Sequence, residues 1–311
     1  MGPVDVDERV LAERDEQTLK ILLSDKTTDG NIRWATDAYA DYGALYQPEE
    51  EMTIEMIRGF GFDLIRPRVC KSDEERRHRT REKAEVFTPA WVCNSQNNLV
   101  DRAWFGREPG FNVEHCGGWE VIREPIAFDA DHTWQDYVDR RVLEVACGEA
   151  PYITTRYDST TGEAYPFLER VGLLDRKLRV VCENAADEHE WLKWARRAVE
   201  SCYAYDFQGD NVLIARENVL ASVEDAYEHQ FSTSMDVPES RRIANIIAWN
   251  IFQMDGYTLS VPYADRPAKQ YQLRLFEIDE GPSTEPIPCK VYDWRAREPI
   301  EFRMLVKGTI L

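Results

Sequence analysis

The residues best suited to chemistry follow a mostly apolar run, Val142 to Val145, that ends in Ala146-Cys147-Gly148-Glu149. A buried parallel strand enters a tight turn in this way at the carboxyl edge of a sheet. Ligands of open α/β sheets bind at that edge, where glycine lets the backbone approach them closely. The stretch therefore predicts a loop that holds a small adenosine-type cofactor, although an ordinary buried strand before a glycine turn has the same pattern.

Two acidic residues further along the chain belong with this loop. Asp206 ends a short apolar strand just before a predicted helix, where nucleotide-binding α/β folds place the carboxylate that accepts hydrogen bonds from ribose. Asp255, followed by Gly256, ends another apolar run and is placed to meet an adenine amino group. Each acid alone is also typical of a solvent-exposed turn. Together and in this order, they favour an adenosine pocket.

The elements that must position these residues are predicted from hydrophobic periodicity and helix-start signals. Thr88 and Pro89 suit a helix start, with Thr88 as the cap and Pro89 in the first helical position. The predicted helices span 10–22, 71–84, 89–102, 134–141, 189–201 and 210–227. The predicted strands span 142–145, 178–182, 202–205, 251–256, 271–278, 290–292 and 299–306, and 241–249 is either a helix or a strand.

This alternation predicts an α/β fold with a mostly parallel central sheet and helices on both faces. Residues 1–80 are expected to form a charged, helical N-terminal extension, and 81–311 the α/β domain, with an insertion at about 154–188. Residues 103–130 are punctuated by glycine and proline and are predicted to be a loop.

The charge balance limits the partners that the chain can bind directly. It contains 57 Asp and Glu against 38 Lys and Arg, a formal net charge of -19 at pH 7. Non-specific DNA affinity requires cations that neutralise phosphates, so DNA contact needs a local basic patch or a partner subunit. The most basic stretch holds four arginines between Arg76 and Arg81. It is predicted either to contact phosphates or to form a solvated helix face.

Cysteine and histidine spacing argues against a disulfide framework and against a zinc site. The seven cysteines include no C-x-x-C pair, and the five histidines are scattered. The sequence shows no signal peptide and no run of 18 apolar residues, so a cytoplasmic protein with reduced thiols and no membrane association is expected.

Three segments resemble the N6-adenine DNA methyltransferases that serve as modification subunits of restriction-modification systems. L-E-V-A-C-G-E-A-P-Y-I at 143–153 resembles the family's cofactor loop, Leu-Asp-Pro-Ala-Cys-Gly-Ser-Gly followed by an apolar or aromatic residue. E-V-F-T-P at 85–89 resembles the Phe-Thr-Pro motif that precedes this loop and touches the methionine part of S-adenosylmethionine. Residues 203–218 resemble the second strand and helix, with Asp206 as the ribose acid.

The resemblance covers about residues 80 to 265 and implies a Rossmann-like class I methyltransferase fold with S-adenosylmethionine as the cofactor. It also implies DNA and a specificity or restriction subunit as partners. The cofactor-binding residues that it implies, together with the acids described above, are Phe87, Thr88, Pro89, Glu144, Ala146, Cys147, Gly148, Glu149, Asp206, Phe207 and Asp255.

The chain departs from the family at two places that matter for catalysis. Ala150 stands where the cofactor loop has its second glycine, and the catalytic Asn-Pro-Pro-Tyr motif has its nearest match in Ser260-Val261-Pro262-Tyr263. In the implied reaction a flipped adenine stacks on Tyr263, and Ser260 takes the polar role at N6. A serine hydroxyl is a poorer acceptor than an asparagine carbonyl, so activity is expected to be weak or absent.

Three functions therefore remain open. The first is a methyltransferase that works with a separate specificity or DNA-binding element. The second is a cofactor-binding scaffold that kept the fold and lost catalysis. The third is an acidic interaction protein that mimics DNA charge or binds a basic partner.

Overall fold

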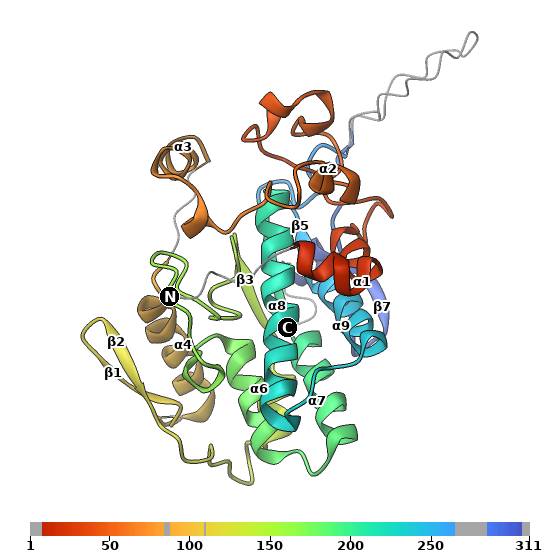
Figure 1. Cartoon of the computed structure of the whole chain (residues 1–311). Helices are drawn as coiled ribbons and strands as arrows, with labels where there is room; N and C mark the ends of the chain where they lie inside the picture. The colour runs from red at the N-terminus through yellow and green to blue at the C-terminus, as the bar shows by residue number, and fades with distance from the viewer. Residues whose placement is uncertain (1–7, 84–87, 109, 265–284, 307–311) are drawn as a thin grey trace.

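The computed structural model describes residues 8–83, 88–108, 110–264 and 285–306. At its centre lies a three-stranded parallel sheet of β3 (Val142–Val145), β4 (Cys202–Asp206) and β5 (Ile251–Gln253), with β4 in the middle. β3 and β5 are labelled on either side of α8 in Figure 1. Val142 lies opposite Cys202, and Ala204 lies opposite Ile251. The carboxyl ends of the three strands therefore meet at one edge, as the sequence predicts, and the fold is mixed α/β.

Two pairs of helices connect these strands. α6 (Leu173–Asn184) and α7 (Glu188–Glu200) lie between β3 and β4, and α8 (Gly209–Phe231) and α9 (Val237–Asn250) lie between β4 and β5. α8 packs against β4, β5, α6 and α9 and is buried along most of its length. The predicted helices at 189–201 and 210–227 are confirmed, and 241–249 is helical.

The predicted strand at 178–182 is wrong, because these residues lie in α6. Two basic side chains just before residues 178–182 are also buried. Arg176 pairs with Asp101 at 2.6 Å, and Lys177 donates to Ser201 Oγ at 2.6 Å. These ion pairs and hydrogen bonds allow α6 to be buried on several sides. The apolar residues 178–182 alone did not indicate a buried helix.

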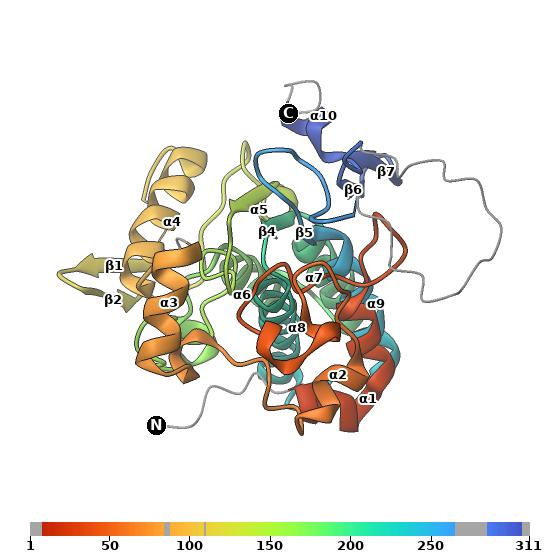
Figure 2. The ribbon, with the colours of Figure 1, turned by 90° about the horizontal axis from the view of Figure 1, so that it is seen from above.

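The described residues cover the second face of the sheet only in part. The hairpin of β6 (Lys290–Asp293) and β7 (Glu298–Glu301), with α10 (Phe302–Val306), packs there against Tyr203 and Phe252, on the side of the molecule away from α4 (Figure 2). On the same face of β3, Leu143 is 47% and Val145 is 61% exposed. The predicted strand at 290–292 is confirmed, the one at 299–306 ends at Glu301, and 271–278 lies outside the described residues.

The N-terminal segment shares the main hydrophobic core. It contains the helices α1 (Glu8–Leu23), α2 (Ile54–Gly59) and α3 (Asp73–Lys83), with short 3-10 turns at Ala40–Tyr42, Ala44–Tyr46 and Arg68–Cys70. α1 packs against α9, and Leu19, Trp34 and Met52 are fully buried in the core that α8 and α9 also line. The described part of the expected extension is therefore packed into the α/β body.

A further group of elements lies beside α6. It comprises α4 (Ala90–Phe105), the hairpin of β1 (Asn112–His115) and β2 (Gly118–Val121), α5 (Trp134–Asp139), and a 3-10 turn at Phe167–Glu169. The hairpin lies within the predicted loop of 103–130. None of the helices in the described ranges combines the length and apolarity needed to cross a bilayer.

Candidate functional site at the sheet edge

The predicted cofactor loop and the predicted ribose acid are joined directly at the carboxyl edge of the sheet. Gly148 N donates to Asp206 Oδ2 at 2.9 Å, and Cys147 N donates to the Tyr205 carbonyl at 2.9 Å. From the next strand, Met254 N donates to the Asp206 carbonyl at 3.0 Å. The ends of β3, β4 and β5, which carry the three groups that the sequence singles out, therefore form one continuous site.

The loop after β3 has an unusual backbone. Gly148 has φ 54°, and Ala146 and Ala150 have φ 49° and 61°. A positive φ is uncommon for residues with a Cβ, and such residues gather at functional sites. Ala150 occupies the position that is glycine in the pattern the loop resembles, and it retains the left-handed conformation that favours glycine there.

Asp206 is 8% exposed and accepts hydrogen bonds from both sides. Its Oδ1 accepts from Gln208 N at 2.9 Å and Asn211 Nδ2 at 3.4 Å, and its Oδ2 accepts from Gly148 N. Burial raises the pKa of Asp206, and the hydrogen bonds from Gln208 and Gly148 act in the opposite direction. A carboxylate oxygen can accept two hydrogen bonds, so Oδ2 can accept one more from a ligand hydroxyl.

The other two acids of the loop region point inward. Glu144 accepts from Tyr152 N at 3.2 Å and Ile153 N at 3.0 Å, and it is 8% exposed. Glu149 is 2% exposed and accepts from Arg68 N at 2.6 Å and from the Tyr157 hydroxyl at 2.8 Å. The structure therefore places both side chains where they hold the loop in shape.

Glu144 makes stability depend on pH in a predictable direction. Burial raises its pKa from 4.5 to about 8. The folded state therefore holds a proton on Glu144 that the unfolded state has lost, so this group's contribution to stability is full below pH 4.5 and is lost as pH rises to about 8. We expect the unfolding free energy of the wild type to fall relative to that of Glu144→Gln by up to about 1.4 kcal/mol per pH unit over this range.

Urea titrations of both proteins from pH 5 to 9 measure this difference. Taking the difference removes the contributions of other titrating groups, which the two proteins share. A constant difference across the range would contradict the assignment.

Two aromatic side chains and one carboxylate follow the carboxyl ends of β4 and β5. Phe207 is 37% exposed, and its ring centroid lies 6.1 Å from that of Tyr263 at an interplanar angle of 65°. Asp255 Oδ1 accepts from Tyr257 N at 2.8 Å and Thr258 N at 3.2 Å, so this carboxylate shapes its own turn. The structure thus brings Tyr263 to the predicted cofactor residue Phe207, which the sequence spacing did not predict.

Ser260 and Pro262 are buried beside this aromatic pair. Ser260 is 6% exposed, its Oγ lies 2.7 Å from Thr258 Oγ1, and its carbonyl accepts from Asp255 N at 2.9 Å. Pro262 is buried as well. Ser260 is therefore largely shielded from solvent, whereas Tyr263 is half-buried.

The segment upstream of α4 reaches the same loop region. The Thr88 carbonyl accepts from Ser159 Oγ at 3.1 Å. The prediction that Thr88 caps the helix is wrong, because Ala90 N donates to the buried Asp158 carboxylate at 2.7 Å and Pro89 takes the N-cap position. Phe87 lies outside the described residues.

A contact that sequence reasoning missed covers the edge between β4 and β5. Gln253 accepts from Arg33 N at 2.8 Å and donates to the carbonyls of Arg33 and Phe207, both at 2.8 Å. Gly209 N donates to the Trp34 carbonyl at 3.0 Å, and a Cβ on Gly209 would lie 1.9 Å from the Arg33 carbonyl oxygen. The glycine at the start of α8 was the one local signal of this close approach.

The predicted basic patch is in part wrong. Arg79 is 3% exposed and forms a bidentate pair with the fully buried Asp210, at 2.6 and 3.0 Å. Lys71 Nζ lies 3.2 Å from the same carboxylate. On the surface of α3, Arg76 pairs with Asp73, and Arg77 and Arg81 are exposed. A buried charge network thus uses Arg79, which removes it from any surface that could contact phosphates.

No family model, curated protein or solved structure matches this chain. Across the described ranges, no three His, Cys, Asp or Glu side chains gather as metal ligands would.

Proposed function

We propose that this chain binds S-adenosylmethionine at the carboxyl edge of β3, β4 and β5, and that it is a component of an adenine-N6 DNA methyltransferase of the restriction-modification type. The observation that carries the proposal is the hydrogen bond from Gly148 N to Asp206 Oδ2 at 2.9 Å. It places the glycine turn after one parallel strand beside the acid at the end of the next, and α/β folds use a glycine turn and an acid in these places to contact a bound nucleotide.

The chemistry of the edge suits the parts of this cofactor. Asp206 Oδ2 is available for a ribose hydroxyl, and the exposed ring of Phe207 offers a face on which adenine can stack. The positive φ at Gly148 and Ala150 fits a backbone that curves closely around a ligand. The carboxylate of Asp206 also favours the positively charged sulfonium.

In this proposal the protein contributes position and shape to methyl transfer. A flipped adenine stacks on Tyr263, whose ring already contacts Phe207, and its N6 attacks the methyl group in line with the sulfonium. The N6–methyl bond forms as the methyl–sulfur bond breaks, and N6 releases its proton. The leaving group would be the neutral thioether of S-adenosylhomocysteine, and the proton would pass to solvent water.

The burial of Ser260 supports a second candidate, a cofactor-binding subunit whose polar catalytic group comes from another chain. The Ser260 hydroxyl lies 2.7 Å from the Thr258 hydroxyl, and Ser260 as a residue is 6% exposed. Parallel strands are ordinarily covered on both faces, yet Leu143 and Val145 on β3 are largely exposed. This apolar face is only partly covered by the described residues, which fits a partner subunit that packs against it.

Transfer of a labelled methyl group from S-adenosylmethionine to unmodified DNA tests the proposal. We expect Tyr263→Ala to lower the transfer rate at least about tenfold, because it removes the stacking surface for the base. Tyr263→Phe keeps the ring and serves as the matched control. Cofactor binding without transfer by the wild type identifies the second candidate. Transfer unchanged by Tyr263→Ala contradicts the role of this residue.

A further inference from the structure

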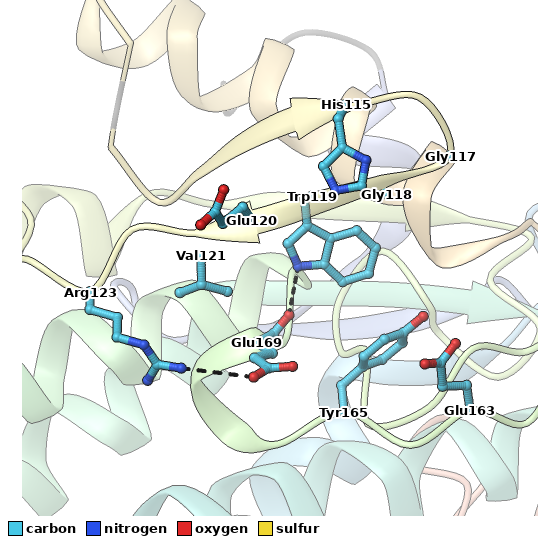
Figure 3. A pocket seen from close by; sticks show the side chains of 10 residues that line it. All are labelled: His115, Gly117, Gly118, Trp119, Glu120, Val121, Arg123, Glu163, Tyr165 and Glu169. Atoms are coloured by element: carbon cyan, nitrogen blue, oxygen red, sulfur yellow. Dashed lines mark hydrogen bonds and ion pairs between the residues drawn. The ribbon is translucent and has the colours of Figure 1, made fainter.

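A cavity of about 470 Å³ lies at the β1–β2 hairpin, apart from the sheet edge described above. Its walls come from the turn between β1 and β2, from β2 itself, and from the loop that leads to the 3-10 turn at Phe167–Glu169 (Figure 3). Two half-buried rings, Trp119 and Tyr165, meet there with their centroids 5.1 Å apart at an interplanar angle of 52°. The proposed methyl transfer uses none of these residues.

The charge of the lining is negative. Three glutamates, Glu120, Glu163 and Glu169, face one arginine, Arg123. Figure 3 shows the carboxylates of Glu163 and Glu169 on either side of the Tyr165 ring. After burial, the nearby carboxylates of Asp158 and Glu163 also raise the pKa of the Tyr165 hydroxyl. A cation entering the cavity is therefore favoured by both the acids and the faces of the rings.

The orientation of Trp119 determines which part of its ring a ligand meets. Its Nε1 donates to the Glu169 carbonyl at 3.0 Å, so the indole N–H is used within the protein and the ring is held in place. Arg123 reaches Glu169 only at 4.0 Å and is 70% exposed in its side chain, so it leaves this carboxylate largely available. The cavity thus presents fixed ring surfaces beside acidic acceptors.

We infer that this cavity binds the guanidinium of an arginine side chain from a partner polypeptide. A guanidinium is planar, so it stacks on a ring while its edge donates to carboxylates in a fork geometry. An ammonium makes only a point contact with the same groups. The cavity is larger than a guanidinium alone, so it also takes in the alkyl chain and the adjoining backbone. The formal net charge of -19 favours a basic partner.

Titration of the full chain with the capped peptide Gly-Gly-Arg-Gly-Gly tests this inference, with the indole N–H signal of Trp119 as the readout. The signal is assigned by its loss in Trp119→Phe. We expect a saturable shift with a Kd below about 1 mM. The lysine peptide should bind several-fold more weakly, and the citrulline peptide, which has the same shape without the charge, should cause no shift.

The double substitution Glu163→Gln, Glu169→Gln should raise the Kd for the arginine peptide at least about fivefold. It changes charge while keeping size, and Glu298→Gln, at an exposed position of β7, is the matched control. Equal shifts with the arginine and citrulline peptides would overturn the inference. An unchanged Kd in the double variant would also overturn it. The absence of a shift at about 10 mM arginine peptide, tenfold above the upper limit expected for the Kd, would do the same.

Discussion

Asp206→Ala is expected to weaken S-adenosylmethionine binding at least about tenfold, because a hydrogen bond to a charged acceptor contributes about 1.5–3 kcal/mol. The substitution removes the acceptor for the ribose and also the partner of Gly148 N, which holds the loop after β3. Both losses weaken binding of the same cofactor. Titration calorimetry of the wild type and the variant measures the change in affinity.

Asp293→Ala is the matched control for this measurement. Asp293 is also 8% exposed and also accepts from two backbone amides, Arg295 N at 2.8 Å and Ala296 N at 3.1 Å. It pairs with Arg141, just before β3, and therefore lies toward the opposite end of the sheet. Cofactor affinity should be unchanged in Asp293→Ala. An equal loss in both variants would mean that the effect of Asp206→Ala is general destabilisation.

Asp210→Asn is expected to lower the free energy of unfolding by about 3–5 kcal/mol, because it removes the buried negative charge that two buried cations contact. Arg79 and Lys71 both contact this fully buried carboxylate, and the Tyr39 hydroxyl donates to it at 2.8 Å. Burial acts to raise the pKa of Asp210, but Arg79 and Lys71 outweigh it and hold the pKa well below its usual range. Its stabilisation is therefore present above pH 4 and is lost as pH falls further.

Asp73→Asn in the same region provides the comparison for a surface pair. Asp73 pairs with Arg76 on α3, and its side chain is 72% exposed. Exposed ion pairs contribute little to stability, so this substitution should leave the unfolding free energy almost unchanged. Urea unfolding of both variants gives the comparison, and an equally small effect of Asp210→Asn would show that the network at Asp210 is not needed for stability.

The elements that the sequence predicted well are those with a local pattern. α7 and α8 carry clear helical periodicity, and β3, β4 and β5 are short apolar runs that end in turn signals. The adjacency of Gly148 and Asp206 followed from parallel pairing, because the carboxyl ends of neighbouring parallel strands meet.

The features that the sequence did not predict depend on contacts distant in the chain. Arg176 of α6 is buried because it pairs with Asp101, which lies in α4. Arg33 and Trp34 lie over the sheet edge because they hydrogen-bond Gln253 and Gly209. β3 also reverses the usual alternation, since Glu144 is buried while Leu143 and Val145 are exposed. No local pattern indicates that a glutamate will satisfy two backbone amides inside the protein.

Hydrogen–deuterium exchange of the wild type with and without S-adenosylmethionine tests the central claim most directly, because it reports both binding and location. The proposal predicts slower exchange in peptides that cover 146–153 and 206–211, and unchanged exchange in α7 and in the β1–β2 hairpin. No change at saturating cofactor, or slowing only outside the sheet edge, would contradict the claim that the loop after β3 and Asp206 form a cofactor site.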